Sequence, residues 1–158
     1  MYKLPLRVKL AYGCGDMANN IIFSITMTYL MYFYTDSVGI SVTASSTIFL
    51  VARFWDAACD PLMGFISDHT KSRFGSYRVY LLFVPLPFVI IFILTFSNFV
   101  MSQQAKLIWA SVTYILLMTL YSAVSIPYAS LSSKITNDPL ERVKLTTYRM
   151  IFSFSGGI

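Results

Sequence analysis

The sequence predicts an all-α integral membrane protein that folds as a bundle of helices. Its 158 residues are 56% hydrophobic and 12% charged, and the mean hydropathy is +0.65. Soluble domains carry about 25% charged residues, so the charged share here is about half the usual one. Several apolar runs reach the roughly 20 residues that a helix needs to cross a bilayer. The run LLFVPLPFVIIFILTF does not alternate in polarity, which argues against the strands of a closed membrane barrel.

Four complete spans and the start of a fifth are predicted. The loops after the first and third spans are short, so we expect the helices that they join to be antiparallel neighbours. The fifth segment has only about half the residues of a full span. We therefore expect residues 1–158 to be one N-terminal transmembrane unit, truncated within a longer bundle. The predicted spans are residues 11–34, 44–66, 79–100, 107–128 and 147–158.

The basic residues predict the orientation of the bundle. Cytoplasmic loops of membrane proteins carry an excess of Lys and Arg. Lys106 lies on one side of the predicted membrane, against nine basic residues on the other. This places the N-terminus in the cytoplasm and explains the basic composition without nucleic-acid binding. The nine residues are Lys3, Arg7, Lys9, Lys71, Arg73, Arg78, Lys134, Arg142 and Lys144.

The stretch RFWDAACDP places three charged side chains inside the second span. Arg53, Asp56 and Asp60 follow the spacing i, i+3, i+7, so they share one face of a helix. Each such charge costs about 2.5–3.5 kcal/mol at the centre of a bilayer. This face must therefore lie against protein or a water-filled cavity, where ionisable groups usually mark an ion or substrate path.

Two carboxylates one helical turn apart are not stable as bare charges. At an effective dielectric constant of about 20 they repel by about 3 kcal/mol. Either one carboxyl group is protonated or a cation lies between them. We interpret Asp56 and Asp60 as a site for a coupling cation or proton, with the carbonyl freed by Pro61 as a further oxygen ligand. The alternative is structural: Arg53 pairs with Asp56, and a neighbouring helix satisfies Asp60.

Other polar side chains lie in the first and fourth spans. Asn19 and Asn20 can bind sugar hydroxyls, because an amide both donates and accepts hydrogen bonds. Tyr121 and Ser125 are similar candidates on the fourth span. The alternative is that these groups only bond one helix to another. No nucleophile–base set, P-loop or dinucleotide motif occurs, so neither an enzyme nor an organic cofactor is predicted.

Four motifs occur in order along the chain: YGCGDMANN, YFYTDSVGIS, FLVARFWDAACDPLMGFISDHTKSRFGSYR and IPYASLSSKITNDPLERVKLTTYR. Together they resemble the glycoside–pentoside–hexuronide:cation symporters, the melibiose-permease-like branch of the major facilitator superfamily. The resemblance covers essentially the whole chain. It implies a major-facilitator-type bundle of two six-helix halves, in which this chain is an incomplete N-terminal half. It also implies sugar uptake driven by Na⁺ or H⁺ through alternating access.

The resemblance assigns a cation site to specific residues. The family's two cation-site aspartates fall on Asp56 and Asp60, and a hydroxyl from the fourth helix falls on Ser122. An asparagine of the family is replaced by Cys59. This replacement removes a hard oxygen ligand and shifts the expectation from Na⁺ toward H⁺.

The resemblance also implies a sugar site and a gate. The two sugar-binding aspartates of melibiose carriers fall on Asn20 and Ser125, which disfavours an α-galactoside. Arg149 matches an arginine linked to the sugar site, where it could complement a hexuronate or belong to the cytoplasmic gate. Further gating or charge-pairing residues are expected at Arg53, Asp68, Arg73 and Arg142.

The sequence thus predicts a sugar:cation symporter of a bacterial inner membrane, inactive without its second half. The expected partners are a sugar, membrane lipid and, if it is present as a separate chain, the C-terminal half of the transporter. The competing interpretation is a membrane remnant or assembly subunit that does not transport, in which the polar residues are structural.

Overall fold

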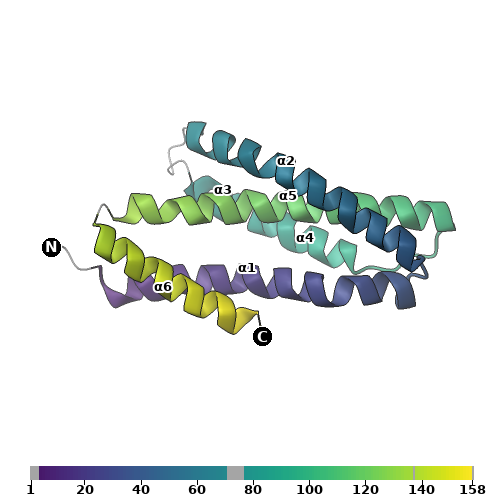
Figure 1. Ribbon diagram of the computed structural model, residues 1–158, viewed down its shortest axis with the longest axis horizontal. Coiled ribbons are helices and arrows are strands. Elements are labelled where there is room, and N and C mark those ends of the chain that lie inside the picture. Colours follow the sequence, from purple (N-terminus) through teal and green to yellow (C-terminus); the bar gives the residue numbers. More distant parts are fainter. Residues whose placement is uncertain (1–3, 71–76, 137, 158) are drawn as a thin grey trace.

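The computed structural model describes residues 4–70, 77–136 and 138–157, and in these residues every regular element is a helix. Figure 1 shows them in an elongated bundle. The elements are α1 (Leu6–Tyr32), the π-helix η1 (Phe33–Ser37), α2 (Val42–His69), α3 (Arg78–Phe83), α4 (Pro85–Thr95), α5 (Gln103–Ile135) and α6 (Pro139–Gly156).

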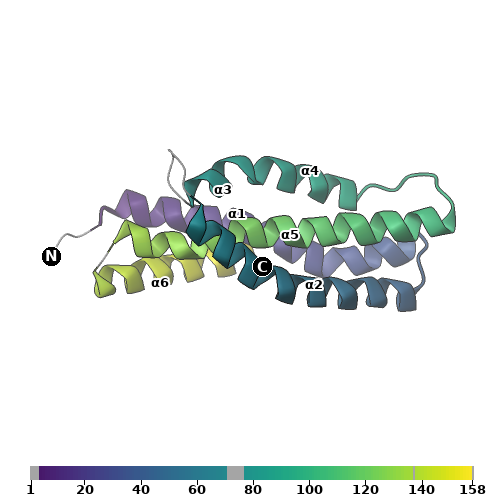
Figure 2. The same cartoon turned by 90° about the horizontal axis from the view of Figure 1, so that it is seen from above.

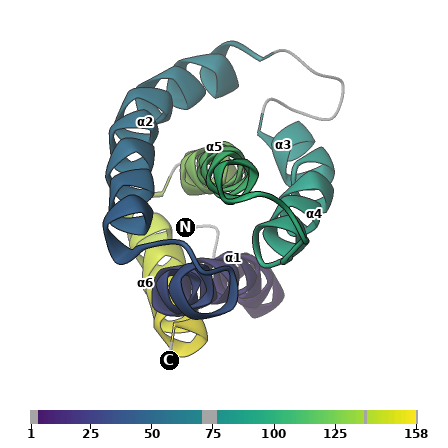
Figure 3. The same ribbon diagram turned by 90° about the vertical axis from the view of Figure 1, so that its right-hand side faces the viewer.

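Helix α5 lies at the centre of the bundle. Figure 2 shows α3 and α4 on one side of α5 and α2 on the other. Helices α1 and α6 pack against each other and complete the ring seen end-on in Figure 3. The arrangement places one face of α2 against α5 and one face of α6 against α1, and these two pairs carry the polar side chains described below.

Side chains at the starts of three helices satisfy main-chain N–H groups that have no partner within the helix. Ser41 accepts from the N–H of Ala44 at the start of α2, and Ser102 accepts from Ala105 at the start of α5. The Asp138 carboxylate accepts from the N–H of Leu140. The first residue of α6 is a proline, which has no N–H group to satisfy.

The described helices differ in their bounds from the predicted spans: α2 and α5 extend beyond both ends of the spans predicted for them, and α1 begins before its span. The segment predicted at 79–100 is divided at Val84 into α3 and α4, because Pro85 has no N–H to continue the ladder, and α4 ends at Thr95. The segment predicted at 147–158 begins earlier, at Pro139, because residues 139–146 form one continuous helix with it.

Helix α5 is the one described helix that is long and apolar enough to cross a bilayer by length and composition. Pro85–Thr95 is a shorter apolar helix. Helix α2 is as long as a span, but it carries the charged residues Arg53, Asp56, Asp60 and Asp68.

A cluster of buried apolar side chains lies where α1 ends and α2 and α5 begin. We call this end of the bundle, at the right of Figure 1, the hydrophobic end. Leu30 and Tyr34 are almost fully buried there, in contact with residues of α2 and α5. The Tyr34 hydroxyl donates to the carbonyl of Ala110 at 3.2 Å, and Lys106 Nζ donates to the carbonyl of Val38 at 2.8 Å. Apolar packing and bonds to main-chain carbonyls hold this end together.

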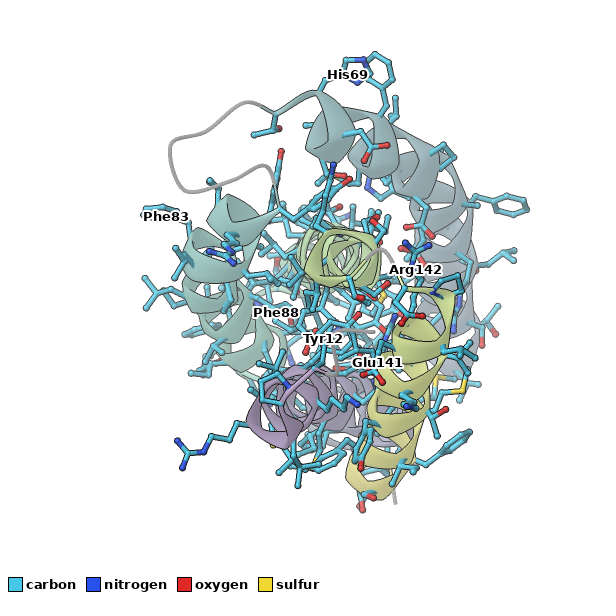
Figure 4. All side chains as sticks on the ribbon, turned by 90° about the vertical axis from the view of Figure 1, so that its left-hand side faces the viewer. Tyr12, His69, Phe83, Phe88, Glu141 and Arg142 are labelled. Atoms are coloured by element: carbon cyan, nitrogen blue, oxygen red, sulfur yellow. The ribbon has the colours of Figure 1, made fainter. Side chains whose placement is uncertain are left out.

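The opposite end, where α1 begins and α6 follows α5, is held by charges; we call it the charged end. Figure 4 shows Glu141 where α6 meets α1. The Glu141 carboxylate lies 2.7 Å from Nζ of both Lys9 and Lys144, and it also accepts from the N–H of Leu4 at 3.3 Å. The Glu141 side chain is only 4% exposed. Because Lys9 lies on α1 and Glu141 on α6, their ion pair ties these two helices together.

Candidate cation and sugar site

Two carboxylates of α2 meet one hydroxyl of α5. Ser122 Oγ lies 3.0 Å from Oδ1 of Asp56 and 2.7 Å from Oδ1 of Asp60. Ser122 is buried, with 3% of its surface exposed. Three oxygen atoms from two helices therefore converge at one point in the middle of α2.

The single proton of the Ser122 hydroxyl limits how many of the two carboxyl groups it can bond. A serine hydroxyl has a single proton, so it can make one full hydrogen bond as a donor. A bond to the second carboxyl oxygen needs a proton on that carboxyl group. Without it, two negative oxygens lie beside one hydroxyl, an arrangement that a bound cation would stabilise. The geometry of Asp56, Asp60 and Ser122 fits a site that takes up a proton or a small hard cation.

The neighbours of this carboxylate pair test the alternative that Arg53 forms an ion pair with Asp56. Among the described contacts, Arg53 forms no ion pair with Asp56; its Nη2 lies 3.3 Å from the sulfur of Met27 on α1. Cys59 is half-buried, and no described hydrogen bond joins its thiol to either carboxylate. The described residues contain no group of three or more His, Cys, Asp or Glu suited to a metal. Any Na⁺ ligands beyond the carboxylates would have to be hydroxyl or carbonyl oxygens.

A second α2–α5 contact lies close to the carboxylates. The indole N–H of Trp55 donates to Oγ1 of Thr119 at 3.0 Å. Thr119 precedes Ser122 by three residues, so both hydroxyls lie on the face of α5 that meets α2. This contact helps to fix the position of α5 along the axis of α2, and so the place where Ser122 meets the carboxylates.

Helices α1 and α6 form a separate polar group. Asp16 Oδ1 lies 3.1 Å from Nε of Arg149. Asn20 Nδ2 lies 3.4 Å from Asp16 Oδ2 and donates to the Asp16 carbonyl at 3.1 Å. The Arg149 guanidinium also lies 5.9 Å from the centre of the Tyr128 ring. The predicted sugar residues Asn20 and Arg149 are thus brought together through Asp16.

A cavity of about 330 Å³ adjoins this ion pair. Small-molecule sites commonly span roughly 300–1,000 Å³, so the volume suits part or all of a small sugar. The hydroxyls of Thr146 and Ser153 add hydrogen-bonding groups to its wall. The lining residues are Asp16, Thr146, Arg149, Met150, Ser153 and Phe154.

The other predicted sugar residues lie elsewhere. Asn19 lines a second, mostly apolar cavity of about 320 Å³ between α1, α4 and α5, and its buried Oδ1 has no partner among the described residues. Tyr121 stacks on Phe23 of α1, with ring centres 4.7 Å apart. Ser125 is half-buried on α5. The structure therefore groups Asn20, but not Asn19, with Arg149.

The predicted gating residues have local contacts. Asp68 accepts from the Tyr77 hydroxyl at 2.7 Å, across the loop that follows α2. Nη2 of Arg142 donates to the carbonyl of Thr136 at 3.3 Å. Arg73 lies outside the described residues. No described contact joins Asp68 to Arg142.

Sequence reasoning did not single out Asp16 as a site residue. Asp16 is a carboxylate within a predicted span, and the criterion that identified Asp56 applies to it equally. Its partner lies on α6, far along the chain. The Tyr12 and Tyr128 rings, which stack at 4.8 Å beside this pair, were also not predicted to meet.

Comparisons with known proteins point to transport. A family model described as MFS/sugar transport protein matches residues 11–158. The chain is 45% identical over 155 residues to the inner membrane symporter YicJ of Escherichia coli, covering 98% of this chain and 34% of YicJ. It is 43% identical to the isoprimeverose transporter of Lactiplantibacillus pentosus, covering 97% of this chain and 32% of that protein. YagG of Escherichia coli, named as a candidate glycoside/cation symporter, is 42% identical over 158 residues, which are 100% of this chain and 34% of YagG. The chain thus spans about a third of the length of these relatives.

Proposed function

Because this chain belongs to the MFS sugar transport family, whose relatives are membrane symporters, we propose that it supplies the first part of a sugar:cation symporter. In this proposal Asp56, Asp60 and Ser122 bind the coupling cation. The relatives are about three times as long, so transport requires a complete carrier and the 158-residue chain alone does not transport.

The observation that carries the proposal is the single buried hydroxyl between two carboxyl groups. Two carboxylates at this separation repel by about 3 kcal/mol at an effective dielectric constant of about 20. A proton or cation bound between them removes this repulsion and lets α2 and α5 pack closely. Binding of the ion would therefore favour one arrangement of the two helices over another, which is the energetic requirement for coupling.

We favour H⁺ over Na⁺ at this site. Na⁺ requires several oxygen ligands. Cys59, which lies between the two aspartates in sequence, offers sulfur in place of oxygen. A proton requires only one carboxyl group and one acceptor, and both are present here.

The sugar site is proposed at the cavity beside Asp16 and Arg149. Arg149 on α6 presents hydrogen-bond donors to this cavity, and Asn20 on α1 supports it indirectly, through its bonds to Asp16. One relative, 43% identical, is named an isoprimeverose transporter. Another, from Escherichia coli, is named a glucuronide carrier protein homolog. It is 35% identical over 150 residues, which are 94% of this chain and 33% of that protein. We propose a pentoside or related glycoside as the substrate class.

Uptake of labelled isoprimeverose, phenyl glucuronide and phenyl galactoside tests the proposal. Vesicles would contain either this chain or a complete carrier with this chain as its first third, at several pH values with and without Na⁺. We expect uptake only by the complete carrier, dependent on pH rather than on Na⁺. Uptake by the 158-residue chain alone would refute the requirement for a complete carrier.

Substitutions in the complete carrier test the cation site. We expect Asp56→Asn and Asp60→Asn each to abolish accumulation of sugar against a gradient, because neither can exchange a proton. Ser122→Ala should weaken coupling less, since both carboxyl groups remain. Accumulation at the unsubstituted level, independent of cations, in both Asn variants would instead favour polar residues with a purely structural role.

The charged end is proposed to face the cytoplasm, as the distribution of Lys and Arg indicates. A cysteine introduced as Leu4→Cys should react with a membrane-impermeant thiol reagent only in inside-out vesicles. Equal labelling of right-side-out vesicles would reverse this orientation.

A further inference from the structure

We propose that Asp16 positions the Arg149 guanidinium for sugar binding, an inference that rests on the proposed function. The Asp16 carboxylate is 5% exposed and lies 3.1 Å from Nε of Arg149. An arginine side chain has several rotatable bonds and loses much of its freedom when it is held in one position. A buried carboxylate bonded to Nε fixes the plane of the guanidinium before a ligand arrives.

The Asp16 carboxylate is itself held in place. Its two oxygens have different partners, because Oδ1 faces Arg149 and Oδ2 lies 3.4 Å from Nδ2 of Asn20. Asn20 also bonds the carbonyl of Asp16, one turn earlier on α1. A chain of polar contacts thus runs from Asn20 through Asp16 on α1 to Arg149 on α6.

The donors of Arg149 can be divided between protein and ligand. A guanidinium donates from Nε and from both Nη atoms. Nε is directed to Asp16, so the Nη groups are the donors for a ligand in the cavity that Arg149 lines. Arg149 is 27% exposed, whereas Asp16 is almost fully buried, as expected if Arg149 contacts the ligand and Asp16 supports it.

The charge of the pair also matters for the ligand. Asp16 and Arg149 together carry no net charge, and both line the cavity. Sugar hydroxyls accept hydrogen bonds, so they can bond the Nη groups of an Arg149 whose charge Asp16 compensates. Removing Asp16 would leave a mobile, uncompensated cation next to the sugar.

A second ion pair between the same two helices provides a matched control. Lys9 and Glu141 also connect α1 to α6, at 2.7 Å, but neither lines the cavity. Glu141→Gln breaks this second pair and leaves Asp16 and Arg149 unchanged. An effect that comes only from weaker α1–α6 packing should appear in both variants.

The experiment measures KM and maximal rate for labelled isoprimeverose, phenyl glucuronide and phenyl galactoside in the complete carrier. We expect Asp16→Ala to raise KM for the transported sugar about tenfold or more, the equivalent of losing one hydrogen bond to a charged group. Asp16→Glu should restore most of the affinity. Glu141→Gln should leave KM unchanged, although it lowers thermal stability.

The outcomes separate this inference from the proposed function. Uptake by the unsubstituted carrier, with an unchanged KM in Asp16→Ala, would overturn the positioning role alone. Equal rises of KM in Asp16→Ala and Glu141→Gln would also overturn it, because helix packing would then explain both. Failure of the unsubstituted carrier to take up or bind any of the three sugars would overturn the proposed function and this inference together.

Discussion

At the hydrophobic end of the bundle Leu30 is fully buried, and the polar groups there bond to neutral main-chain carbonyls. At the charged end the corresponding role belongs to Glu141, which is almost as deeply buried but is bonded to two lysines. Both ends join helices that are far apart in the sequence. One end relies on the shape of its side chains and the other on charge.

This difference determines which conditions can loosen each end. Apolar packing does not depend on protonation and is little affected by salt. The contacts of Glu141 depend on its charge, so acid and substitution act on them directly. The charged end is therefore the end whose stability depends on protonation.

Leu30→Ala should have the largest effect on stability. Core Leu→Ala changes in soluble proteins cost about 2–5 kcal/mol. In a bilayer the transfer part of this cost is smaller, because lipid is as apolar as leucine, so we expect a loss of about 2 kcal/mol. Thermal unfolding in detergent measures it, with Leu50→Ala as a control because Leu50 is 58% exposed. Equal losses in both variants would show that the hydrophobic end is not specifically packed.

Glu141→Gln should have a smaller effect that depends on pH. Hydrogen bonds from Lys144 and Lys9 lower the pKa of Glu141 from 4.5 to about 2. The stabilisation is therefore complete above pH 4.5 and is lost as the pH falls toward 2. Unfolding measured across this range should show a steeper loss for the unsubstituted protein than for Glu141→Gln. Parallel curves would contradict a role for this ion pair.

Lys144→Gln should have the smallest effect of the three. Lys144 is 53% exposed, whereas Lys9, on the other side of Glu141, is 11% exposed. Solvent and salt screen exposed ion pairs. We expect Lys9→Gln to lower the melting temperature more than Lys144→Gln does, and added salt to remove the effect of Lys144→Gln first. The reverse order would show that Lys144 is the main partner of Glu141.

Local patterns in the sequence were enough for part of the candidate site. Helical periodicity places Asp56 and Asp60 on one face of α2, and the cost of burying charge requires that this face meet a polar partner. The choice of Ser122 as that partner came from family resemblance, because periodicity within α2 says nothing about which helix lies opposite. The structure shows the contact itself.

Other features depended on contacts that no local pattern contains. Asp16 and Arg149 lie at opposite ends of the chain, and each alone reads only as a charged residue in an apolar segment. The separation of Asn19 from Asn20 follows from the rotation of α1 about its axis, because adjacent residues on a helix point about 100° apart. That rotation is set by the packing of α1 against α5 and α6.

The sequence by itself determined that the chain is helical and apolar, that α2 carries charges within a predicted span, and that the family is one of sugar transporters. These properties follow from the composition of the chain and from spacings and motifs that each lie within a short stretch of sequence. Only the tertiary structure decided that Ser122 lies between two carboxyl groups, that Asp16 holds Arg149, and that Glu141 ties α1 to α6. The physical reason is that these contacts join different helices, and the approach and rotation of each helix depend on the packing of all the others.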